Sequence, residues 1–272
     1  MKRVLSADCF EFRKSKMTYI LPSVSVLLGI LMPLMYYGIY ALFKYLGSLD
    51  IMEGQTPFAS LNALLETLNA KTVFLSVLPI SQGIGLVITA MIGFRAVRPF
   101  GTGVYRNKVI AQVPRGAIYL SQSLYCLILT MVSAVLYALT AALSSSLTFG
   151  SLDLSGREVL VIALLSIGIY LVYTAIPVFV AFLTRSVPLT LIVSILLPVL
   201  SQTVVSLVST ALMSAPKAVL NAIAVLPAFQ NAYLMVAEAS DTVLLISLAS
   251  DVAIAALLTV TGILRFRKRD VN

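Results

Sequence analysis

The stretch VLVIALLSIGIYLVYTAIPVFVAFL, residues 159–183, decides the fold, because it is long, apolar and free of charge. A helix of about 20 mostly apolar residues is long enough to cross the hydrocarbon core of a bilayer. Five other segments have the same character: residues 18–43, 72–94, 118–143, 187–213 and 243–264. The sequence therefore predicts an all-α, polytopic integral membrane protein with six transmembrane helices.

The composition of the 272-residue chain supports the same conclusion. Apolar residues make up 60% of it and charged residues 11%, whereas a soluble domain is about 45–50% apolar and about 25% charged. The chain has no histidine, which excludes His-based catalytic triads and His-ligated zinc or haem. Its two cysteines lie far apart, so we expect no metal site. No low-complexity linker divides the chain, and we expect one transmembrane domain over residues 1–272.

The basic residues predict the orientation of the six spans. With the N-terminus inside, only Lys44, Lys71, Arg157 and Lys217 of the 19 basic residues fall outside. Cytoplasmic loops carry the excess of Lys and Arg in membrane proteins, so we predict that both termini lie inside. This topology accounts for the placement of the net charge of +8, so we expect the chain to lie in the lipid membrane and to bind no nucleic acid.

One apolar segment, residues 218–237, complicates this count. It is uncharged for 20 residues and offers a possible seventh span, but a seventh span would place Arg265 and Arg267 outside. Pro227 and polar residues such as Gln230 also interrupt it. We therefore predict a re-entrant or interfacial helical hairpin on the outer side, between spans five and six, which needs surrounding protein to satisfy its backbone.

The N-terminal residues before the first span suggest a surface helix. Leu5, Cys9 and Phe12 recur at helical spacing, and basic residues follow at positions 13, 14 and 16. This pattern is typical of a short helix lying on the inner membrane surface. A frayed basic tail is the alternative.

A row of small residues marks the second predicted span. Ser81, Gly85, Thr89 and Gly93 lie four residues apart and form a flat strip on one helix face. Small residues allow helices to approach closely in lipid. The strip fits either an interface with a partner or ordinary packing within the chain.

Asp251 is the strongest polar signal inside a predicted span. A carboxylate at that depth costs about 2.5–3.5 kcal/mol on insertion scales, so a partner, water or a proton must offset it. Ser247 and Ser250 lie nearby in sequence. Asp251 either lines a substrate or proton path, with Gln82 and Gln202 as further polar candidates, or caps a buried polar cluster.

The sequence lacks the short motifs that bind nucleotide phosphates or carry a catalytic serine. There is no G-x-x-x-x-G-K-[ST] phosphate loop and no G-x-S-x-G nucleophile motif. We therefore assign no catalytic residues, and we expect that the chain is not an enzyme by itself and binds no cofactor. Any ATP-driven role requires a second protein.

The inner connection between spans two and three carries the most specific string, GTGVYRNKVIAQVPRGAIYLSQ, residues 101–122. Residues 95–117 hold five basic side chains and no acidic one. The string resembles the permease subunits of type 2 ABC exporters, most closely the small permeases of bacitracin-resistance and lantibiotic-immunity transporters. Residues 10–16 resemble the interfacial elbow helix of that family, and FRKRD, residues 266–270, resembles its ending after span six.

The resemblance implies a function and a set of partners. Two permeases would pair, as a homodimer or with a related subunit, and two copies of a separate ATPase subunit would supply ATP and Mg²⁺. The complex would sit in the cell membrane and export an amphipathic cargo such as an antimicrobial peptide, a drug or a lipid. The residues that would couple the permease to the ATPase are those of the inner loop: Gly101, Thr102, Arg106, Asn107, Lys108 and Arg115.

Two other functions remain open at this point. The chain could be a non-transporting scaffold or sensor component of the membrane, which would tolerate charge reversal in the inner loop. It could also be an ion-coupled carrier that uses Asp251 and needs no ATPase.

Overall fold

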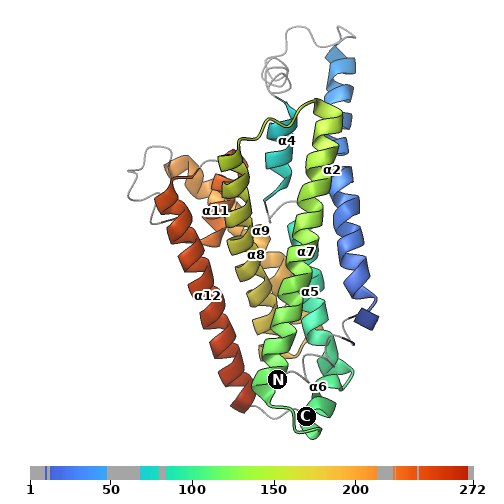
Figure 1. Cartoon of the computed structure of the whole chain (residues 1–272), viewed down its shortest axis with the longest axis vertical. Helices are drawn as coiled ribbons and strands as arrows, with labels where there is room; N and C mark the ends of the chain where they lie inside the picture. The colour runs from blue at the N-terminus through green and yellow to red at the C-terminus, as the bar shows by residue number, and fades with distance from the viewer. Residues whose placement is uncertain are drawn as a thin grey trace.

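The computed structural model of the chain describes residues 10, 13–47, 68–79, 84–212, 223, 225–237 and 239–268. Every regular element within these residues is an α-helix (Figure 1). The helices are α2 (Met17–Gly47), α4 (Ala70–Val77), α5 (Ile84–Gly101), α6 (Val104–Ile110), α7 (Arg115–Phe149), α8 (Gly156–Thr184), α9 (Val187–Leu212), α11 (Pro227–Val236) and α12 (Asp241–Lys268).

Six of these helices are long and apolar enough to cross a membrane: α2, α5, α7, α8, α9 and α12. The predicted multi-pass, all-helical membrane fold is therefore confirmed. The possible seventh span is not a spanning helix, because Val225 and Leu226 are not helical and α11 after them has only 10 residues. The first arm of the expected hairpin lies mostly outside the described residues.

The second predicted span, residues 72–94, is wrong as one continuous helix. The structure divides it into α4 and α5, with Leu78 and Pro79 outside both helices. Proline has no N–H to donate within a helix, and its ring clashes with the preceding turn. The Tyr137 hydroxyl donates to the Val77 carbonyl at 2.9 Å, which satisfies a backbone group at the break. Helix α5 then continues past the predicted end at residue 94, through Arg95 and Arg98.

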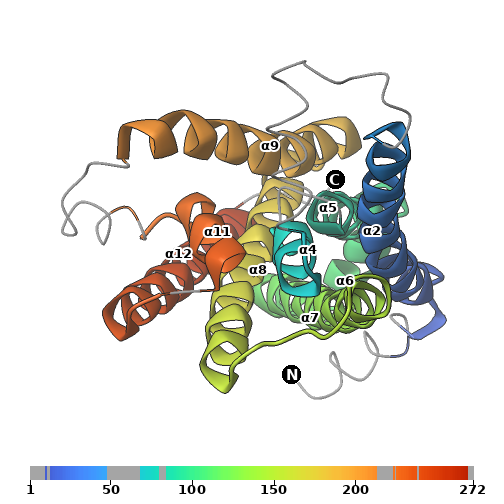
Figure 2. The same ribbon diagram turned by 90° about the horizontal axis from the view of Figure 1, so that it is seen from above.

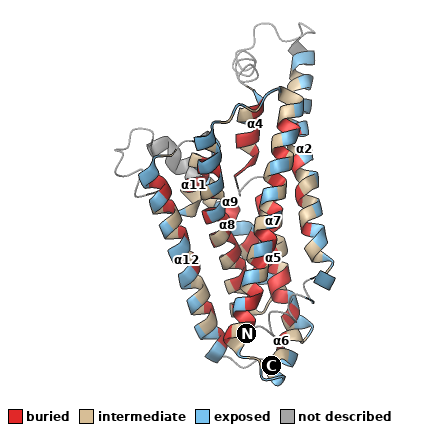
Figure 3. Cartoon of the chain, viewed as in Figure 1, coloured by how far each residue is buried: buried red, intermediate tan, exposed pale blue. Residues whose placement is uncertain are grey.

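Helix α5 lies in the middle of the bundle. It packs against α2, α7, α8 and α9, and Figure 2 shows these four helices around it. Within its spanning segment 56% of the residues are buried, against 11% for α2. Many of the exposed residues of α2, α7, α9 and α12 are apolar, as expected for helices in contact with lipid. Figure 3 shows exposed positions along α2 and α12 in pale blue.

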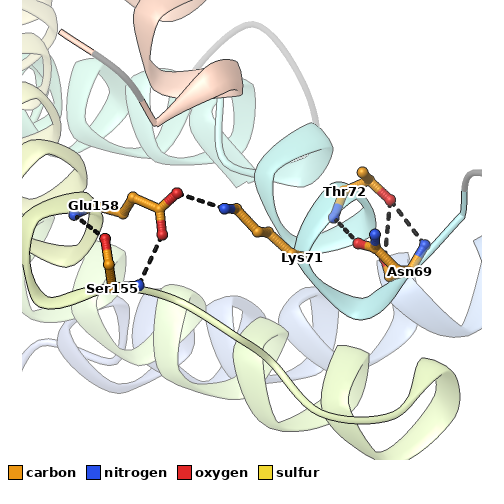
Figure 4. A network of polar contacts seen from close by, with 5 residues as sticks. All are labelled: Asn69, Lys71, Thr72, Ser155 and Glu158. Atoms are coloured by element: carbon orange, nitrogen blue, oxygen red, sulfur yellow. Dashed lines mark hydrogen bonds and ion pairs between the residues drawn. The ribbon is translucent and has the colours of Figure 1, made fainter.

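Polar contacts fix the short helix α4 to the start of α8 (Figure 4). Lys71 of α4 forms an ion pair with Glu158 of α8. Glu158 also closes a capping box with Ser155, and a second capping box joins Asn69 to Thr72 at the start of α4. Both helices thus begin with their first N–H groups satisfied, as stable helix starts require. We call this end of the bundle the α4 end.

The opposite end, the α6 end, holds α6, the start of α2 and the end of α12 (Figure 1). Phe10, Arg13 and Lys14 are helical there, and the Lys14 ammonium lies 4.5 Å from the centre of the Phe10 ring. The three residues that predicted a surface helix, Leu5, Cys9 and Phe12, lie outside the described residues.

Candidate functional site

Helix α6 is a separate short helix between α5 and α7. The turn before it depends on Gly103, which has a left-handed φ of 72° that glycine adopts without steric cost. The Gly103 carbonyl accepts the first helical hydrogen bond, from the Asn107 N–H at 2.9 Å. Gln112 and Pro114 then end the connection before α7 begins. The connection between α5 and α7 is thus a defined helix between two turns.

Tyr105 fixes one face of α6 to the bundle. Its side chain is only 1% exposed, and its hydroxyl donates to the Ala96 carbonyl of α5 at 3.3 Å. The Tyr105 ring centre lies 4.6 Å from that of Phe100 and 5.2 Å from that of Phe182. A buried tyrosine with both its ring and its hydroxyl engaged holds α6 in one orientation.

Tyr105 belongs to a group of five aromatic residues that we call the aromatic cluster: Phe100, Tyr105, Tyr119, Phe182 and Phe266. Each comes from a different helix, namely α5, α6, α7, α8 and α12. The Phe182 ring is the common neighbour, with centre distances of 4.7 Å to Tyr119 and 4.9 Å to Phe266. Within the cluster α6 therefore contacts α5 and α8 directly, through Phe100 and Phe182, and it is linked to α7 and α12 through Phe182.

The six residues that were predicted to form the coupling loop differ in their exposure and in their contacts. Arg106 and Asn107 are exposed on α6. Gly101, the last residue of α5, and Thr102, in the turn before α6, are also exposed. The Lys108 ammonium lies 5.8 Å from the Tyr105 ring centre. Arg115 has another role, because its guanidinium donates to the Arg267 carbonyl at 3.0 Å and joins α7 to α12. The exposed surface of α6 thus includes Arg106 and Asn107.

Asp251 lies in a second, fully buried site where α8, α11 and α12 meet. Its carboxylate is 0% exposed, and Oδ1 accepts a hydrogen bond from Nε2 of Gln230 at 3.1 Å. Gly168 of α8 provides the space, because a Cβ there would overlap Oδ2 and lie 3.2 Å from Cγ of Asp251. Ser250, one partner considered from the sequence, donates instead to the Ser247 carbonyl. The sequence identified Gln230 only as a polar interruption, and its contact with Asp251 was missed.

The other polar candidates for a pathway do not extend this site. Gln202 is half-buried on α9. The hydrogen bond that Asp251 accepts comes from Gln230 on a different helix, α11. Gln82 lies outside the described residues. Among the described residues, no group of three His, Cys, Asp or Glu side chains is arranged to hold a metal ion.

The described members of the row of small residues on α5 pack against other helices of the same chain. Gly85, Thr89 and Gly93 are all buried, while Ser81 lies outside the described residues. A Cβ at Gly93 would lie 2.5 Å from Oγ of Ser194 on α9. Gly93 is therefore used for close approach between α5 and α9, which favours the intrachain interpretation over a partner interface.

A groove of about 290 Å³ opens on the side of the bundle between α7, α8 and α12. Leu120, Leu124 and Leu127 line it from α7, and Leu171 and Val178 line it from α8. The Ser and Thr hydroxyls in its wall each donate to a carbonyl of their own helix. The groove therefore presents an apolar wall that suits a hydrocarbon chain.

No protein-family model and no curated protein matches this chain.

Proposed function

We propose that this chain is the permease subunit of an ATP-driven exporter of the type 2 ABC class, working with a separate ATPase. The observation that carries the proposal is the arrangement of α6. Its buried face is held in the aromatic cluster, and its exposed face presents Arg106 and Asn107 away from the bundle. An exposed short helix that is rigidly joined to several spanning helices is suited to receive a force from outside and pass it on.

The charges on α6 favour an acidic partner surface. Arg106 and Lys108 lie on a seven-residue helix that has no acidic residue. Complementary charge across an interface guides association and fixes its register. By the distribution of basic residues, the α6 end faces the cytoplasm, where a soluble ATPase would be available.

The lateral groove supports an amphipathic cargo. Its apolar wall is open at the side of the bundle, between spanning helices. An antimicrobial peptide, a drug or a lipid dissolved in the bilayer would reach such a groove without first entering water. The two ATPase copies would carry ATP and Mg²⁺, and a second permease, identical or related, would complete the transporter.

Charge reversal on α6 tests the proposal. We expect Arg106→Glu with Lys108→Glu to reduce the ATPase recovered with the tagged chain by at least about tenfold, or 1.4 kcal/mol, because two attractive charges become repulsive. The measurement is affinity purification from the native host in mild detergent, with quantitative mass spectrometry.

The control for this experiment is Arg265→Glu with Lys268→Glu, which reverses two exposed charges at the same end of the bundle. We expect this variant to retain the ATPase. Recovery of the unaltered chain without any ATPase, in detergent and in lipid nanodiscs, would contradict the proposal and favour a scaffold or sensor role.

Asp251 favours one second candidate, an ion-coupled carrier. The carboxylate is fully buried, and Oδ2 has no hydrogen-bond partner, which leaves a position for a proton or cation. Under the exporter proposal, Asp251→Asn should change cargo movement by less than about tenfold, because asparagine keeps the shape and the acceptor for Gln230. Cargo movement in proteoliposomes measures this, with ATP or a proton gradient as the energy source. Complete loss of gradient-driven movement in Asp251→Asn would favour the carrier.

A further inference from the structure

Asp251 of α12 is a carboxyl group inside the bundle with a single hydrogen bond. Oδ1 accepts from the Gln230 amide of α11 at 3.1 Å, and Oδ2 is buried without a hydrogen-bond partner. Oδ2 instead faces Gly168 of α8, where a Cβ would overlap it. Among the described residues, one neutral amide is therefore the only hydrogen-bond donor to this carboxyl group.

The helices around Asp251 bring no opposite charge to it. Neither α11 nor α9 carries a charged residue. Helix α8 has only Arg157 and Glu158, which lie in its first turn, about 15 Å or more along the helix from Gly168, and both are paired with residues of other helices. The single charge of α7 and the other charges of α12 lie at helix ends. Within the part of the chain that the structure describes, no cation compensates a charge on Asp251.

The other titratable groups on these helices are tyrosines near the site. Tyr173 of α8 is close enough to interact electrostatically with Asp251, and its hydroxyl is hydrogen bonded to Oγ of Ser201 on α9 at 2.9 Å. Tyr170 interacts instead with a tyrosine of α7, and Tyr233 of α11 is half-buried. Because phenol groups titrate near pH 10 and are neutral below it, none of them supplies a positive charge.

This environment favours the neutral form of the carboxyl group. An isolated carboxylate in apolar surroundings costs far more free energy than a neutral polar group, so such a group takes up a proton unless a cation or water reaches it. The proton belongs on Oδ2, because Oδ1 already accepts from Gln230. The buried arrangement of Asp251 is therefore also a binding site for one proton.

Helix α11 is the element around Asp251 that depends most on its neighbours. It has 10 residues, and isolated helices shorter than about 12–15 residues are marginal in water, whereas α8 and α12 have 29 and 28 residues. No side chain caps its first N–H groups. It lies toward the α4 end of the bundle (Figure 1). A movement of α11 is thus the shortest way for water to reach Asp251.

We propose that Asp251 holds a proton on Oδ2 while α11 packs against α8 and α12, and that loss of this proton releases α11. The O–H bond breaks as α11 moves, and the proton passes to the entering water, which hydrates the carboxylate. Because only the open arrangement favours the ionised form, a rise in pH shifts the population toward release. The proton need not cross the membrane, and the proposal does not depend on the exporter proposal, whose test concerns α6 at the opposite end.

Infrared difference spectroscopy of the full chain in dodecyl maltoside, a detergent without carbonyl groups, tests the proton. A protonated carboxyl group has a C=O stretching band that a carboxylate lacks. At about pH 5, where exposed carboxyl groups are mostly ionised, we expect this band in the unaltered chain and not in Asp251→Asn, and we expect it to disappear by about pH 9. The control Asp241→Asn removes an exposed carboxylate from the same helix and should keep the band. Absence of the band from the unaltered chain at about pH 5 would overturn the proposal.

Hydrogen–deuterium exchange with mass spectrometry tests the release of α11. At about pH 9 we expect α11 to exchange at least about tenfold faster in the unaltered chain than in Asp251→Asn, which stays neutral, and at about pH 5 we expect equal exchange. Comparison at one pH removes the chemical pH dependence of exchange, and Asp241→Asn should behave as the unaltered chain does.

The unaltered chain alone gives the same test without a substitution. Exchange of α11 relative to α8 should increase as the pH rises, because α8 is a long spanning helix that stays in place. A constant ratio of α11 to α8 exchange between about pH 5 and about pH 9, or equal exchange of α11 in the unaltered chain and Asp251→Asn at the higher pH, would show that the proton does not hold α11.

Discussion

Phe182→Ala is expected to lower the free energy of unfolding by about 3–5 kcal/mol, the largest effect of any single substitution at the α6 end. Phe182 is 3% exposed and contacts all four other members of the aromatic cluster. Its removal leaves a cavity between five helices that none of them can fill without moving. One of the contacts that orient α6 through Tyr105 is lost at the same time, while those with Phe100 and the Ala96 carbonyl remain.

Reversible unfolding by sodium dodecyl sulfate in mixed micelles measures this effect. The matched control is Phe179→Ala, which makes the same substitution one turn earlier on α8, at a half-buried position outside the cluster. We expect the control to cost much less. Phe182→Leu should restore part of the loss because it refills most of the volume. Equal costs for Phe182→Ala and Phe179→Ala would show that the cluster does not stabilise the α6 end.

The second large effect concerns the contact between Gly168 and Asp251. Gly168→Ala should destabilise the protein by about 1–3 kcal/mol, since its methyl group would overlap Oδ2 of Asp251. Asp251→Ala should also destabilise it, by about 1–3 kcal/mol, because Gln230 loses its acceptor. The double variant should cost less than the sum, with a coupling of about 0.5–3 kcal/mol, since removing the carboxylate opens space for the new methyl group.

A double-mutant cycle on unfolding free energies in mixed micelles provides the test. Gly38→Ala on α2 is the control, because no heavy atom outside its own helix lies within 4 Å of a Cβ there. This control should be neutral or slightly stabilising, as alanine favours helix over glycine. Strict additivity of Gly168→Ala and Asp251→Ala would show that α8 and α12 do not meet through this pair.

The sequence predicted the long elements well where hydrophobic length alone decides them. The segments around residues 159–183 and 187–213 became α8 and α9 within a few residues, because a run of apolar side chains must stay in lipid. The second span was wrong at two points that hydrophobic length does not decide. The chain leaves the helix at Leu78 and Pro79, within the predicted span. The end of the span was also predicted where the charged residues begin, yet Arg95 is buried inside the protein, and only the packing of neighbouring helices accommodates it there.

The candidate sites were predictable only in part. The string around Arg106 indicated an inner element by its glycines, basic residues and proline, and the structure describes a helix there. The aromatic cluster was not predictable, because Tyr105, Phe182 and Phe266 are far apart in the sequence and no spacing rule joins them. Asp251 stood out by its charge, but its partner Gln230 lies on a separate short helix whose position depends on the whole bundle.

The central position of α5 has a consequence for how the protein is made. Among the six long helices, α5 is the least apolar and the most enclosed by protein. With 18 residues it extends about 27 Å, slightly less than the hydrocarbon thickness of about 30 Å. Three of the helices that enclose it, α7, α8 and α9, are synthesised after it. During synthesis, α5 must therefore be kept out of contact with lipid, at the translocon or against α2, until the later helices have been inserted and pack against it.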